Sequence, residues 1–509
     1  MKRAPSLLAL LLVLLPLVAA CEPGASSSNS PSPSPTATQM GSITWAACPA
    51  SDPTAGGNAE LRCATLRVPR DYAAPDGPTI DLHLALLPAT DPGRRVGPLL
   101  LNFGGPGASG IDILAESGRG VVPAAIASRF DLVTWDPRGT GRSAPIDCLT
   151  DAELDDWIYT DGIPAKPTAA DWSAAASDAQ WFAGKCEERS GDLIPYIGTT
   201  ASARDMESIR AALGVAKLDY LGFSYGTSLG AVYATLFPVS TGHLLLDGAT
   251  DPAPTLDSEY GEQGVSIQGA LDRLFSWCDA NTDCGFGDGS ARRAFDALLA
   301  DAAKQPLKLD DGRSLTPGMI WTGVVLTLYN RDYWDYAVQA LGGAANDGDG
   351  SLLATLADIY VDRNASGSYR SNIMESFPVI SCMDHPTDGS VATFRSIYAR
   401  FAKRAPDFAS GQAAGGLLCG AFTLRNADPL PAVVDGAGAP AILVVGTTGD
   451  PATPYEWSVR LADALERGRL LTYEGEGHTG VGGKSTCIDA AAVDFLVDGT
   501  LPAEGTRCK

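Results

Sequence analysis

The chain has 509 residues, of which 45% are hydrophobic and 19% are charged, the composition of an ordinary globular protein. This length is sufficient for one large enzyme core and a second, smaller unit. The formal net charge of −23 argues against a nucleic-acid partner, because binding to phosphates requires clustered Lys and Arg.

The N-terminus has the features of an export signal. A basic start, Lys2-Arg3, precedes an apolar run over residues 7–18 that is too short to span a bilayer permanently. The segment Val18-Ala19-Ala20-Cys21 resembles a bacterial lipobox, whose cysteine is acylated in the mature protein. We therefore expect residues 1–20 to be a lipoprotein signal peptide and Cys21 to anchor the chain to the membrane, outside the cytoplasm. A plain secretory signal with an incidental cysteine is the alternative.

Residues 21–41 are predicted to be the acylated cysteine and a tether. Between residues 22 and 39 almost every residue is Ser, Pro, Thr, Ala or Gly. Such a composition cannot bury a hydrophobic core, so we expect a flexible connection between the membrane and the folded protein.

The eleven cysteines also favour export. Setting Cys21 aside leaves ten, an even number that in an exported chain indicates disulfides, here five. Pairing between neighbours along the chain is the simplest arrangement, although the sequence does not fix the connectivity. There is no C-x-x-C pair and no H-E-x-x-H motif, so we expect neither a metal site nor a cofactor.

Apolar runs that end in turn residues predict buried strands of a mostly parallel sheet. These runs cover residues 98–103, 131–135, 218–222, 243–246, 441–445 and 469–473. Helical patterns lie between some of them, which places helices on both faces of the sheet. One helix is predicted over residues 202–213, with Ser202 and Asp205 at capping-box spacing and Gly214 as its stop. Residues 43–48 and 79–87 predict an antiparallel start.

Two regions interrupt this alternation of strands and helices. Residues 147–196 form an insertion rich in Asp and Ala. Residues 252–431 are predicted to be a mainly helical cap inserted between two parts of the core, 42–251 and 432–509. A separate downstream domain is the alternative, but strand-like runs resume at Ala441.

The pattern G-x-S-x-G surrounds Ser224. It follows the predicted strand 218–222 and precedes a predicted helix, 227–237, that Pro238 closes. A serine at such a strand-to-helix turn is the nucleophile elbow of α/β hydrolases, in which the glycines relieve backbone crowding. The chain contains 56 glycines and the pattern can arise by chance, so the interpretation depends on this position between strand and helix.

A nucleophilic serine needs a histidine to accept its proton and a carboxylate to orient that histidine. In α/β hydrolases the chain order is Ser, acid, His. Of the four histidines, His478 is the candidate base, because it lies in a glycine-rich loop after the last predicted strand. Asp450, which follows the predicted strand 441–445, is the candidate acid. Asp247, which follows the strand 243–246, is the alternative.

An acyl-transfer site also needs backbone N–H groups that bind the developing oxyanion. The N–H of Tyr225, the residue after the nucleophile, is one candidate. The loop Asn102–Gly107, with the sequence N-F-G-G-P-G, offers the other. We assign the second donor to Gly105, with Gly104 as the alternative.

Five motifs in this order form a recognisable set: Gly104-Gly105-Pro106-Gly107, Trp135-Asp136-Pro137-Arg138-Gly139-Thr140-Gly141-Arg142-Ser143, the Ser224 elbow, Gly449-Asp450-Pro451-Ala452-Thr453-Pro454 and Gly477-His478. From about residue 42 to the end, the chain resembles the proline iminopeptidase-like serine peptidases. The resemblance is strongest to the secreted tripeptidyl aminopeptidases of actinomycetes and to mycobacterial cell-envelope lipoprotein proteases and carboxylesterases. It implies an α/β-hydrolase fold with a cap, a triad of Ser224, Asp450 and His478, and cleavage of peptides from the N-terminus.

The resemblance also bears on residues around the triad. Thr453 matches a threonine that the mycobacterial relatives carry three residues after the acid, which implies support of the triad by hydrogen bonding. Asp136 and Arg138 are expected to order the wall behind the oxyanion loop. Asn102-Phe103 is a departure, because proline iminopeptidases have histidine before the glycines, and it puts the proline-specific activity in doubt.

An aminopeptidase must bind the ammonium group of its substrate, for which carboxylates of the cap are suitable partners. Asp384 is the candidate, because a disulfide at the nearby Cys382 would hold it rigidly; an exposed surface carboxylate is the alternative. The sequence therefore predicts an extracytoplasmic serine hydrolase that releases short peptides, of the tripeptidyl type, from peptide or protein N-termini. A carboxylesterase or lipase and, from another class, a solute-binding lipoprotein are the alternatives.

Overall fold

The computed structural model describes residues 38–40, 43–160 and 162–509. The predicted signal peptide and the predicted lipidation site Cys21 lie outside the described residues. Of the predicted tether, residues 38–40 are described, and they form β1 (Thr38–Met40), which pairs antiparallel with β2 (Ile43–Ala47).

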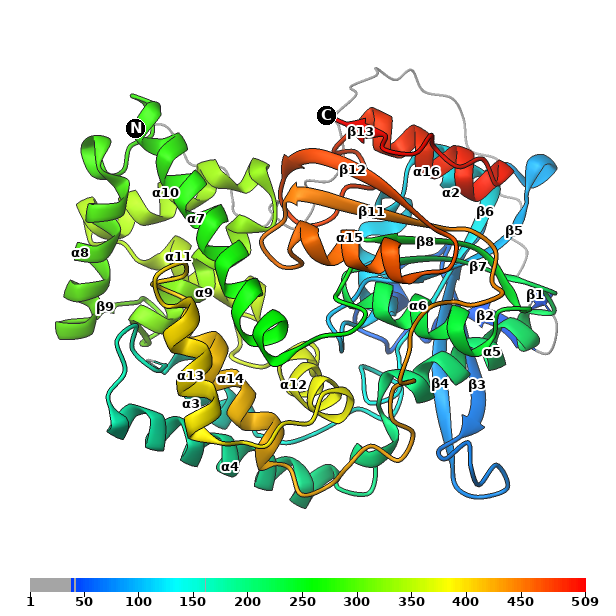
Figure 1. Ribbon diagram of the computed structural model, residues 1–509, viewed down its shortest axis with the longest axis horizontal. Helices are drawn as coiled ribbons and strands as arrows, with labels where there is room; N and C mark the ends of the chain where they lie inside the picture. Colours follow the sequence, from blue (N-terminus) through cyan, green and yellow to red (C-terminus); the bar gives the residue numbers. More distant parts are fainter. Residues whose placement is uncertain (1–37, 41–42, 161) are drawn as a thin grey trace, which may run out of the picture.

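An eleven-stranded sheet forms the core, in the order β1-β2-β3-β4-β6-β5-β7-β8-β11-β12-β13 (Figure 1). Its other strands are β3 (Arg62–Pro69), β4 (Thr79–Leu87), β5 (Gly97–Asn102), β6 (Phe130–Trp135), β7 (Leu218–Phe223), β8 (Thr241–Asp247), β11 (Ile442–Gly449), β12 (Gly468–Glu476) and β13 (Arg507–Cys508). Pairing is antiparallel from β1 to β6 and parallel from β6 to β13. The predicted mostly parallel sheet with an antiparallel start is confirmed.

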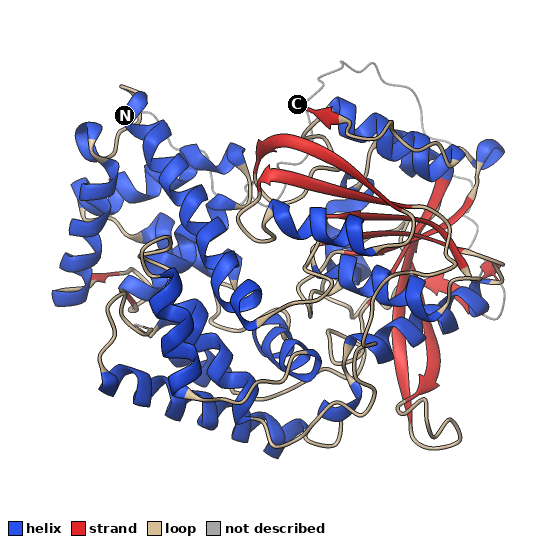
Figure 2. Cartoon of the chain, viewed as in Figure 1, coloured by secondary structure: helices blue, strands red, loops and turns tan. Residues whose placement is uncertain are grey.

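Alternate residues of the central strands face two different hydrophobic layers, because successive side chains of a strand point to opposite faces. Leu100 of β5 packs in the layer of α5 (Thr199–Leu213), α6 (Tyr225–Leu236) and α15 (Tyr455–Ala464). Its neighbours Leu99 and Leu101 pack in the layer of α1 (Gly110–Ser117), α2 (Ala124–Arg129) and α16 (Thr486–Asp498). Helices therefore cover both faces of the sheet, as predicted (Figure 2).

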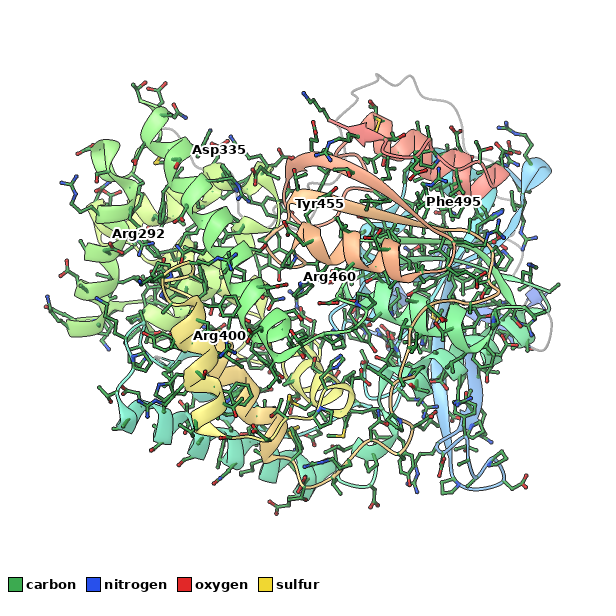
Figure 3. All side chains as sticks on the ribbon, in the orientation of Figure 1. Arg292, Asp335, Arg400, Tyr455, Arg460 and Phe495 are labelled. Atoms are coloured by element: carbon green, nitrogen blue, oxygen red, sulfur yellow. A yellow bond between two sulfur atoms is a disulfide. The ribbon has the colours of Figure 1, made fainter. Side chains whose placement is uncertain are left out.

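A helical unit lies beside the sheet and comes mainly from the chain between β8 and β11 (Figure 1). Its helices are η6 (Ser258–Glu262), α7 (Gln263–Ala280), α8 (Ala291–Lys304), α9 (Pro317–Leu328), α10 (Trp334–Gly342), α11 (Ser351–Tyr360), α12 (Ile373–Asp384), α13 (Val391–Phe401) and α14 (Ala409–Ala421). We call these helices the cap. Figure 3 shows Arg292, Asp335 and Arg400 on the cap, whereas Tyr455, Arg460 and Phe495 lie on α15 and α16 of the core.

The earlier insertion contributes to the same helical layer. It contains α3 (Asp151–Tyr159) and α4 (Ala169–Ser190), and Trp172 of α4 is buried with Phe394 and Leu417 of the cap. A disulfide between Cys148 and Cys186 ties α4 to the segment after β6. The helical unit beside the sheet is thus built from two stretches of chain rather than from residues 252–431 alone.

Among the residues that the structure describes, five disulfides join neighbouring cysteines along the chain, and the predicted arrangement is confirmed. They are Cys48–Cys63, Cys148–Cys186, Cys278–Cys284, Cys382–Cys419 and Cys487–Cys508. Across the described ranges, 38–40, 43–160 and 162–509, no helix combines the length and apolarity needed to cross a bilayer.

One predicted helix start is wrong. Helix α5 begins at Thr199 with Gly198 as N-cap, three residues before the predicted capping box. The carboxylate of Asp384, from the cap, accepts the backbone N–H of Thr199 at 2.8 Å and takes the place of a local capping side chain. Asp205 lies inside the helix and is buried against Arg138, which the local pattern of residues could not indicate.

Candidate active site

Ser224 occupies the turn between β7 and α6 with a left-handed backbone, φ 55° and ψ −125°. Few residues other than glycine adopt a positive φ, and such strain clusters at functional sites. The neighbouring glycines are required by packing: a Cβ on Gly222 would lie 2.4 Å from the carbonyl oxygen of Gly226, and one on Gly226 would lie 2.8 Å from that of Asn102. The G-x-S-x-G pattern therefore forms the strand-to-helix elbow that the sequence predicts.

Asp450 and His478 lie on the loops after β11 and β12, two neighbouring parallel strands that β8 separates from β7. The Nδ1 atom of His478 is 2.9 Å from Oδ2 and 3.0 Å from Oδ1 of Asp450. The Asp450 carboxylate also accepts the backbone N–H groups of Ala452 at 2.8 Å and Thr453 at 2.9 Å. Burial alone would raise the pKa of Asp450, but His478 and these donors hold it below the ordinary value. An ionised Asp450 can thus orient the imidazole.

The nucleophile turn and the base loop meet at Asp247-Gly248. The backbone N–H of Ser224 donates to the carbonyl of Asp247 at 2.9 Å. A Cβ on Gly248 would lie 3.1 Å from Cε1 of His478, so the imidazole packs directly on this glycine. Within the described part of the chain, no hydrogen bond joins Ser224 Oγ to the ring. Catalytic hydrogen bonds of this kind often shorten only in the substrate complex.

Asp247, the alternative acid, has a different environment. Its carboxylate accepts the backbone N–H of Gly480 at 3.0 Å and that of Val481 at 2.8 Å. The imidazole Nδ1 is bonded to Asp450 instead. The geometry therefore favours Asp450 as the partner of the base.

The oxyanion loop lies against the elbow. A Cβ on Gly104 would be 2.8 Å from Cβ of Ser224 and 3.3 Å from the backbone nitrogen of Tyr225, so only glycine fits this approach. The N–H of Gly104 donates to Asn102 Oδ1 at 3.0 Å, which leaves the N–H of Gly105 as the candidate donor to an oxyanion. The other candidate, the N–H of Tyr225, belongs to the first turn of α6, where backbone N–H groups lack partners within the helix.

Asp136 and Arg142 brace the segment behind this loop. The buried carboxylate of Asp136 accepts Ser109 Oγ at 2.7 Å and the backbone N–H of Ile111 at 3.2 Å, at the start of α1. Arg142 donates to Asp136 at 3.2 Å and to Asp52 at 2.6 Å. These contacts fix the first turn of α1, just after the glycines of the loop.

Thr453 lies beside both members of the Asp450–His478 pair. Its Oγ1 atom donates to Asp450 Oδ2 at 3.1 Å and lies 3.4 Å from Nδ1 of His478. The structure thus places Thr453 where the resemblance implied.

Asp384 lies at the end of α12, with both carboxylate oxygens bonded to Thr199. Oδ1 accepts the backbone N–H at 2.8 Å and Oδ2 accepts Oγ1–H at 2.6 Å. The same Oγ1 atom is 2.5 Å from the hydroxyl of Tyr225, so the residue next to the nucleophile is connected to the cap. Burial raises the pKa of Asp384 to about 7. Asp384 therefore joins the cap to the core and is held rigidly, although by Thr199 as well as by the disulfide.

The sequence analysis missed two residues near this site. Glu259 lies on η6, and burial, with the charges of Asp384 and Asp251, raises its pKa to about 8. Tyr329 follows α9 of the cap; its carbonyl accepts the backbone N–H of His478 at 2.8 Å, and the two rings meet edge to face at 5.5 Å. Neither residue belongs to a motif. Only the folding of the cap onto the strand ends brings them there.

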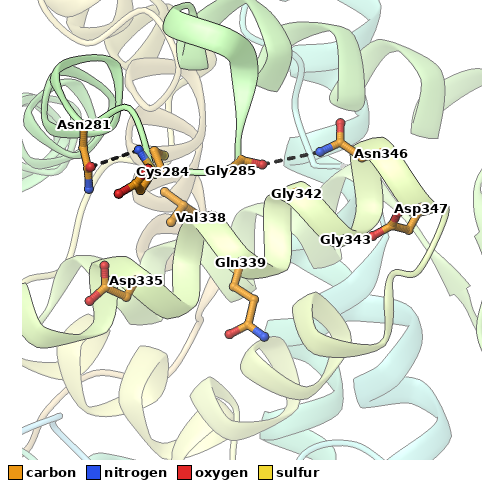
Figure 4. Close-up of a pocket in the computed structure, with 11 residues that line it drawn as sticks. Asn281, Cys284, Gly285, Asp335, Val338, Gln339, Gly342, Gly343, Asn346 and Asp347 are labelled. Carbon is orange, nitrogen blue, oxygen red and sulfur yellow. Dashed lines mark hydrogen bonds between the residues drawn. The ribbon is translucent and has the colours of Figure 1, made fainter. Parts of the chain in front are cut away.

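A cavity of about 410 Å³ lies elsewhere, on the cap (Figure 4). Polar side chains from the segment after α7, from α10 and from the following helix η9 (Gly343–Asp347) line it, among them Asn281, Asp335, Gln339 and Asn346. None of the predicted site residues lines this cavity. In the part of the chain that the structure describes, no group of three or more His, Cys, Asp or Glu side chains is placed to hold a metal ion.

Comparison with known proteins finds relatives that are all named as hydrolytic enzymes. The family described as TAP-like protein matches residues 405–508. Serine protease Hip1 of Mycobacterium tuberculosis is 34% identical over 490 residues, covering 92% of this chain and 91% of the relative. Carboxylesterase B of the same organism is 36% identical, covering 88% and 86%. The tripeptidyl aminopeptidase of Streptomyces lividans is 32% identical, covering 88% and 83%.

Among solved structures, the proline iminopeptidase of Mycobacterium smegmatis matches with a TM-score of 0.38 and 15% identity, over 85% of this chain and 97% of that one.

Proposed function

The chain belongs to the TAP-like family of α/β-hydrolase serine hydrolases, and on that premise we propose that it is an aminopeptidase that releases short peptides, of the tripeptidyl type, from polypeptide N-termini. The observation that carries the proposal is the Asp450–His478 pair, 2.9 Å apart, on strand-end loops beside the turn that bears Ser224. The solute-binding alternative is excluded, because the chain is a serine hydrolase.

The proposed reaction proceeds through an acyl-enzyme. Ser224 Oγ attacks the scissile carbonyl carbon while His478 Nε2 accepts the Oγ proton, and Asp450 stabilises the resulting imidazolium. The N–H groups of Tyr225 and Gly105 bind the oxyanion. The C–N bond then breaks, and His478 returns the proton to the leaving amine. Water attacks the acyl-enzyme with His478 again as base, which releases the short peptide and restores Ser224.

We also propose that Thr453 holds the Asp450 carboxylate in its orientation toward His478. Its hydroxyl, 3.1 Å from Oδ2 of Asp450, donates to the carboxylate and limits its rotation. A carboxylate held by several donors keeps the same orientation through both half-reactions, so the imidazole stays aligned between Ser224 and the leaving group.

Binding of the substrate ammonium is assigned to the carboxylates of Asp384 and Glu259. Asp384 is linked through Thr199 Oγ1 to the hydroxyl of Tyr225, which places it near the elbow. Glu259 is close enough to Asp384 for the charge of one to raise the pKa of the other. A cationic ligand relieves this repulsion between two carboxylates, which favours a free N-terminus over a blocked one.

The proposed location is extracytoplasmic, on the membrane through a lipid at Cys21. The five disulfides support an oxidising compartment. The substrate would then be an exported peptide or protein whose N-terminus reaches the cap side of the sheet.

A carboxylesterase is the second candidate function. The observation that favours it is the 36% identity to carboxylesterase B, which exceeds the 32% identity to the tripeptidyl aminopeptidase. The same serine, histidine and aspartate would act on an ester, so the substrate contacts of the cap decide between the two.

One assay separates these functions. Free peptides, the same peptides N-acetylated, and a series of acyl esters are compared as substrates by kcat/KM. The aminopeptidase proposal predicts that acetylation lowers kcat/KM by at least about tenfold, because the substrate loses the ammonium group that binds the carboxylates of Asp384 and Glu259. Equal rates on free and acetylated peptides, or turnover of esters alone, would contradict it. Ser224→Ala is the control and should abolish turnover and labelling by a fluorophosphonate.

A further inference from the structure

One buried residue outside the proposed triad contacts the nucleophile turn through its backbone and the base loop through its side chain. Asp247, at the end of β8, accepts the N–H of Ser224 on its carbonyl oxygen at 2.9 Å. Its carboxylate accepts the N–H groups of Gly480, at 3.0 Å, and Val481, at 2.8 Å. Its exposure is 0%, so these are the interactions that compensate for its burial.

We propose that Asp247 is a positioning residue that sets the distance and orientation of His478 relative to Ser224. This proposal rests on the catalytic roles assigned above to Ser224 and His478. Because Nδ1 of His478 is bonded to Asp450, Asp247 acts through the backbone of the base loop and not as the acid of the triad.

The base loop needs such support because of its own sequence. Residues 477–484 read G-H-T-G-V-G-G-K, and Gly477, Thr479, Gly482 and Gly483 have φ values of 97°, 67°, 105° and 100°. Glycine-rich backbone has many accessible conformations, so a loop of this composition does not fix an imidazole by itself.

A half-buried charge holds the opposite side of the loop. Lys484 Nζ donates to the carbonyl oxygen of His478 and, at 3.3 Å, to that of Thr479. The backbone N–H groups of Gly480 and Val481 therefore donate to the carboxylate of Asp247. The backbone carbonyl groups of His478 and Thr479 accept from the ammonium group of Lys484. Gly248, adjacent to Asp247, completes the support, because it packs against the imidazole, and a Cβ there would lie only 3.1 Å from Cε1.

The consequence is specific to the chemical step. A displacement of about 1 Å between reacting groups can lower a rate about 100-fold. Loss of the Asp247 carboxylate should therefore impair proton transfer by His478 more than it impairs substrate binding, which depends on residues of the cap.

The test is Asp247→Asn in the full chain, assayed with an aryl acyl ester and with a fluorophosphonate that phosphonylates Ser224. Asparagine keeps the shape of the side chain but has only one acceptor oxygen. Its NH₂ group, which is a donor, would face a backbone N–H that is also a donor. We expect kcat and the phosphonylation rate to fall together by about 10- to 100-fold, with KM within about twofold of wild type. Asp131→Asn is the matched control: Asp131 is also a buried strand aspartate, but it bonds to Arg95 and Ala89, away from the site. It should leave kcat unchanged.

Lys484→Met gives an independent readout if Asp247→Asn does not fold. It removes the donor to the His478 carbonyl and should also lower kcat without raising KM. Where both variants fold, the double variant should lose less than the product of the two single losses, because both side chains hold one loop.

The proposal would be overturned if folded Asp247→Asn protein were phosphonylated at the wild-type rate. It would also be overturned if the Asp247→Asn variant kept the wild-type kcat and showed a raised KM. A wild-type enzyme that the fluorophosphonate does not label would instead contradict the assignment of Ser224.

Discussion

The carbonyl oxygen of Tyr329, on the cap, accepts the backbone N–H of His478 at 2.8 Å, and the tyrosine ring meets the imidazole edge to face. Asn330, the next residue, pairs with Gly477 as an isolated antiparallel bridge. The cap side of the molecule therefore contacts His478, the proposed base, directly.

This contact predicts how substitutions at Tyr329 behave. Tyr329→Phe keeps both the carbonyl and the ring, so kcat should stay within about twofold of wild type. Tyr329→Ala removes the ring that packs against the imidazole, and kcat should fall about tenfold through misalignment of the base. The measurement is kcat on an acyl ester, with Tyr336→Ala, elsewhere on the cap, as the control. Equal kcat for the alanine and phenylalanine variants would show that the ring does not position His478.

Thr453 gives a second prediction, based on one hydroxyl. Thr453→Val keeps the shape and the backbone N–H that donates to Asp450, but removes the Oγ1 donor at 3.1 Å. Hydrogen bonds to charged groups contribute about 1.5–3 kcal/mol, so kcat should fall about tenfold if this bond matters more in the transition state than in the ground state.

Thr453→Ser is the matched variant, since it restores the hydroxyl without the methyl group. The kcat values of both variants on an acyl ester provide the measurement. Recovery of activity in the serine variant is expected, and a valine variant with wild-type kcat would remove Thr453 from the catalytic arrangement.

The buried pair of Arg138 and Asp205 predicts a loss of stability without a loss of chemistry. Both side chains are 0% exposed and 2.6 Å apart, and Arg138 also donates to backbone carbonyls of Arg70 and Tyr196. Arg138→Met should lower the free energy of unfolding by about 3–5 kcal/mol, because it leaves a buried carboxylate without its cation.

Arg67→Met is the comparison, since Arg67 pairs with Asp81 on the surface with side-chain exposures of 71% and 46%. That exposed pair should contribute little to the free energy of unfolding, because solvent and salt screen it. Urea unfolding measures both variants, and kcat of folded Arg138→Met should match wild type. Equal unfolding midpoints for the two variants would contradict the structural role of Arg138.

The parts of the molecule that the sequence could predict are those encoded locally. The apolar runs of β5, β6, β7, β8, β11 and β12 predicted the sheet, because a strand buried on both faces needs almost continuous hydrophobic sequence. The elbow at Ser224 and the loops that carry Asp450 and His478 were predicted because each joins a motif to a strand end. β3 was missed, since it is mostly half-buried or exposed and mixes polar and apolar residues without a strong apolar run.

The parts that the sequence could not predict depend on contacts between distant segments. The start of α5 was misplaced because Asp384, 185 residues away along the chain, caps Thr199. Glu259 and Tyr329 reach the site only through the packing of the cap. The role of Asp247 was open for the same reason, because its partners Gly480 and Val481 lie more than 230 residues later.

Glu259 predicts an unusual dependence of stability on pH. Burial and the neighbouring carboxylates raise its pKa from 4.5 to about 8, and burial raises that of Asp384 from 3.8 to about 7. A carboxyl group whose pKa is higher in the folded state favours folding below its unfolded pKa, and this stabilisation is lost as pH rises through the folded pKa. For Glu259 the loss therefore extends from about pH 4.5 to about pH 8.

Glu259→Gln tests this directly, because glutamine cannot ionise. The wild-type melting temperature should fall between pH 5 and pH 9, and the variant should lose about 2 °C less over the same interval. Glu504→Gln, at an exposed position near the C-terminus, is the control and should follow the wild-type curve. Melting curves at pH 5, 7 and 9 provide the measurement. If the melting temperature of the variant falls as steeply as that of wild type, folding does not raise the pKa of Glu259. The repulsion between carboxylates that is proposed to favour a substrate ammonium would then be absent.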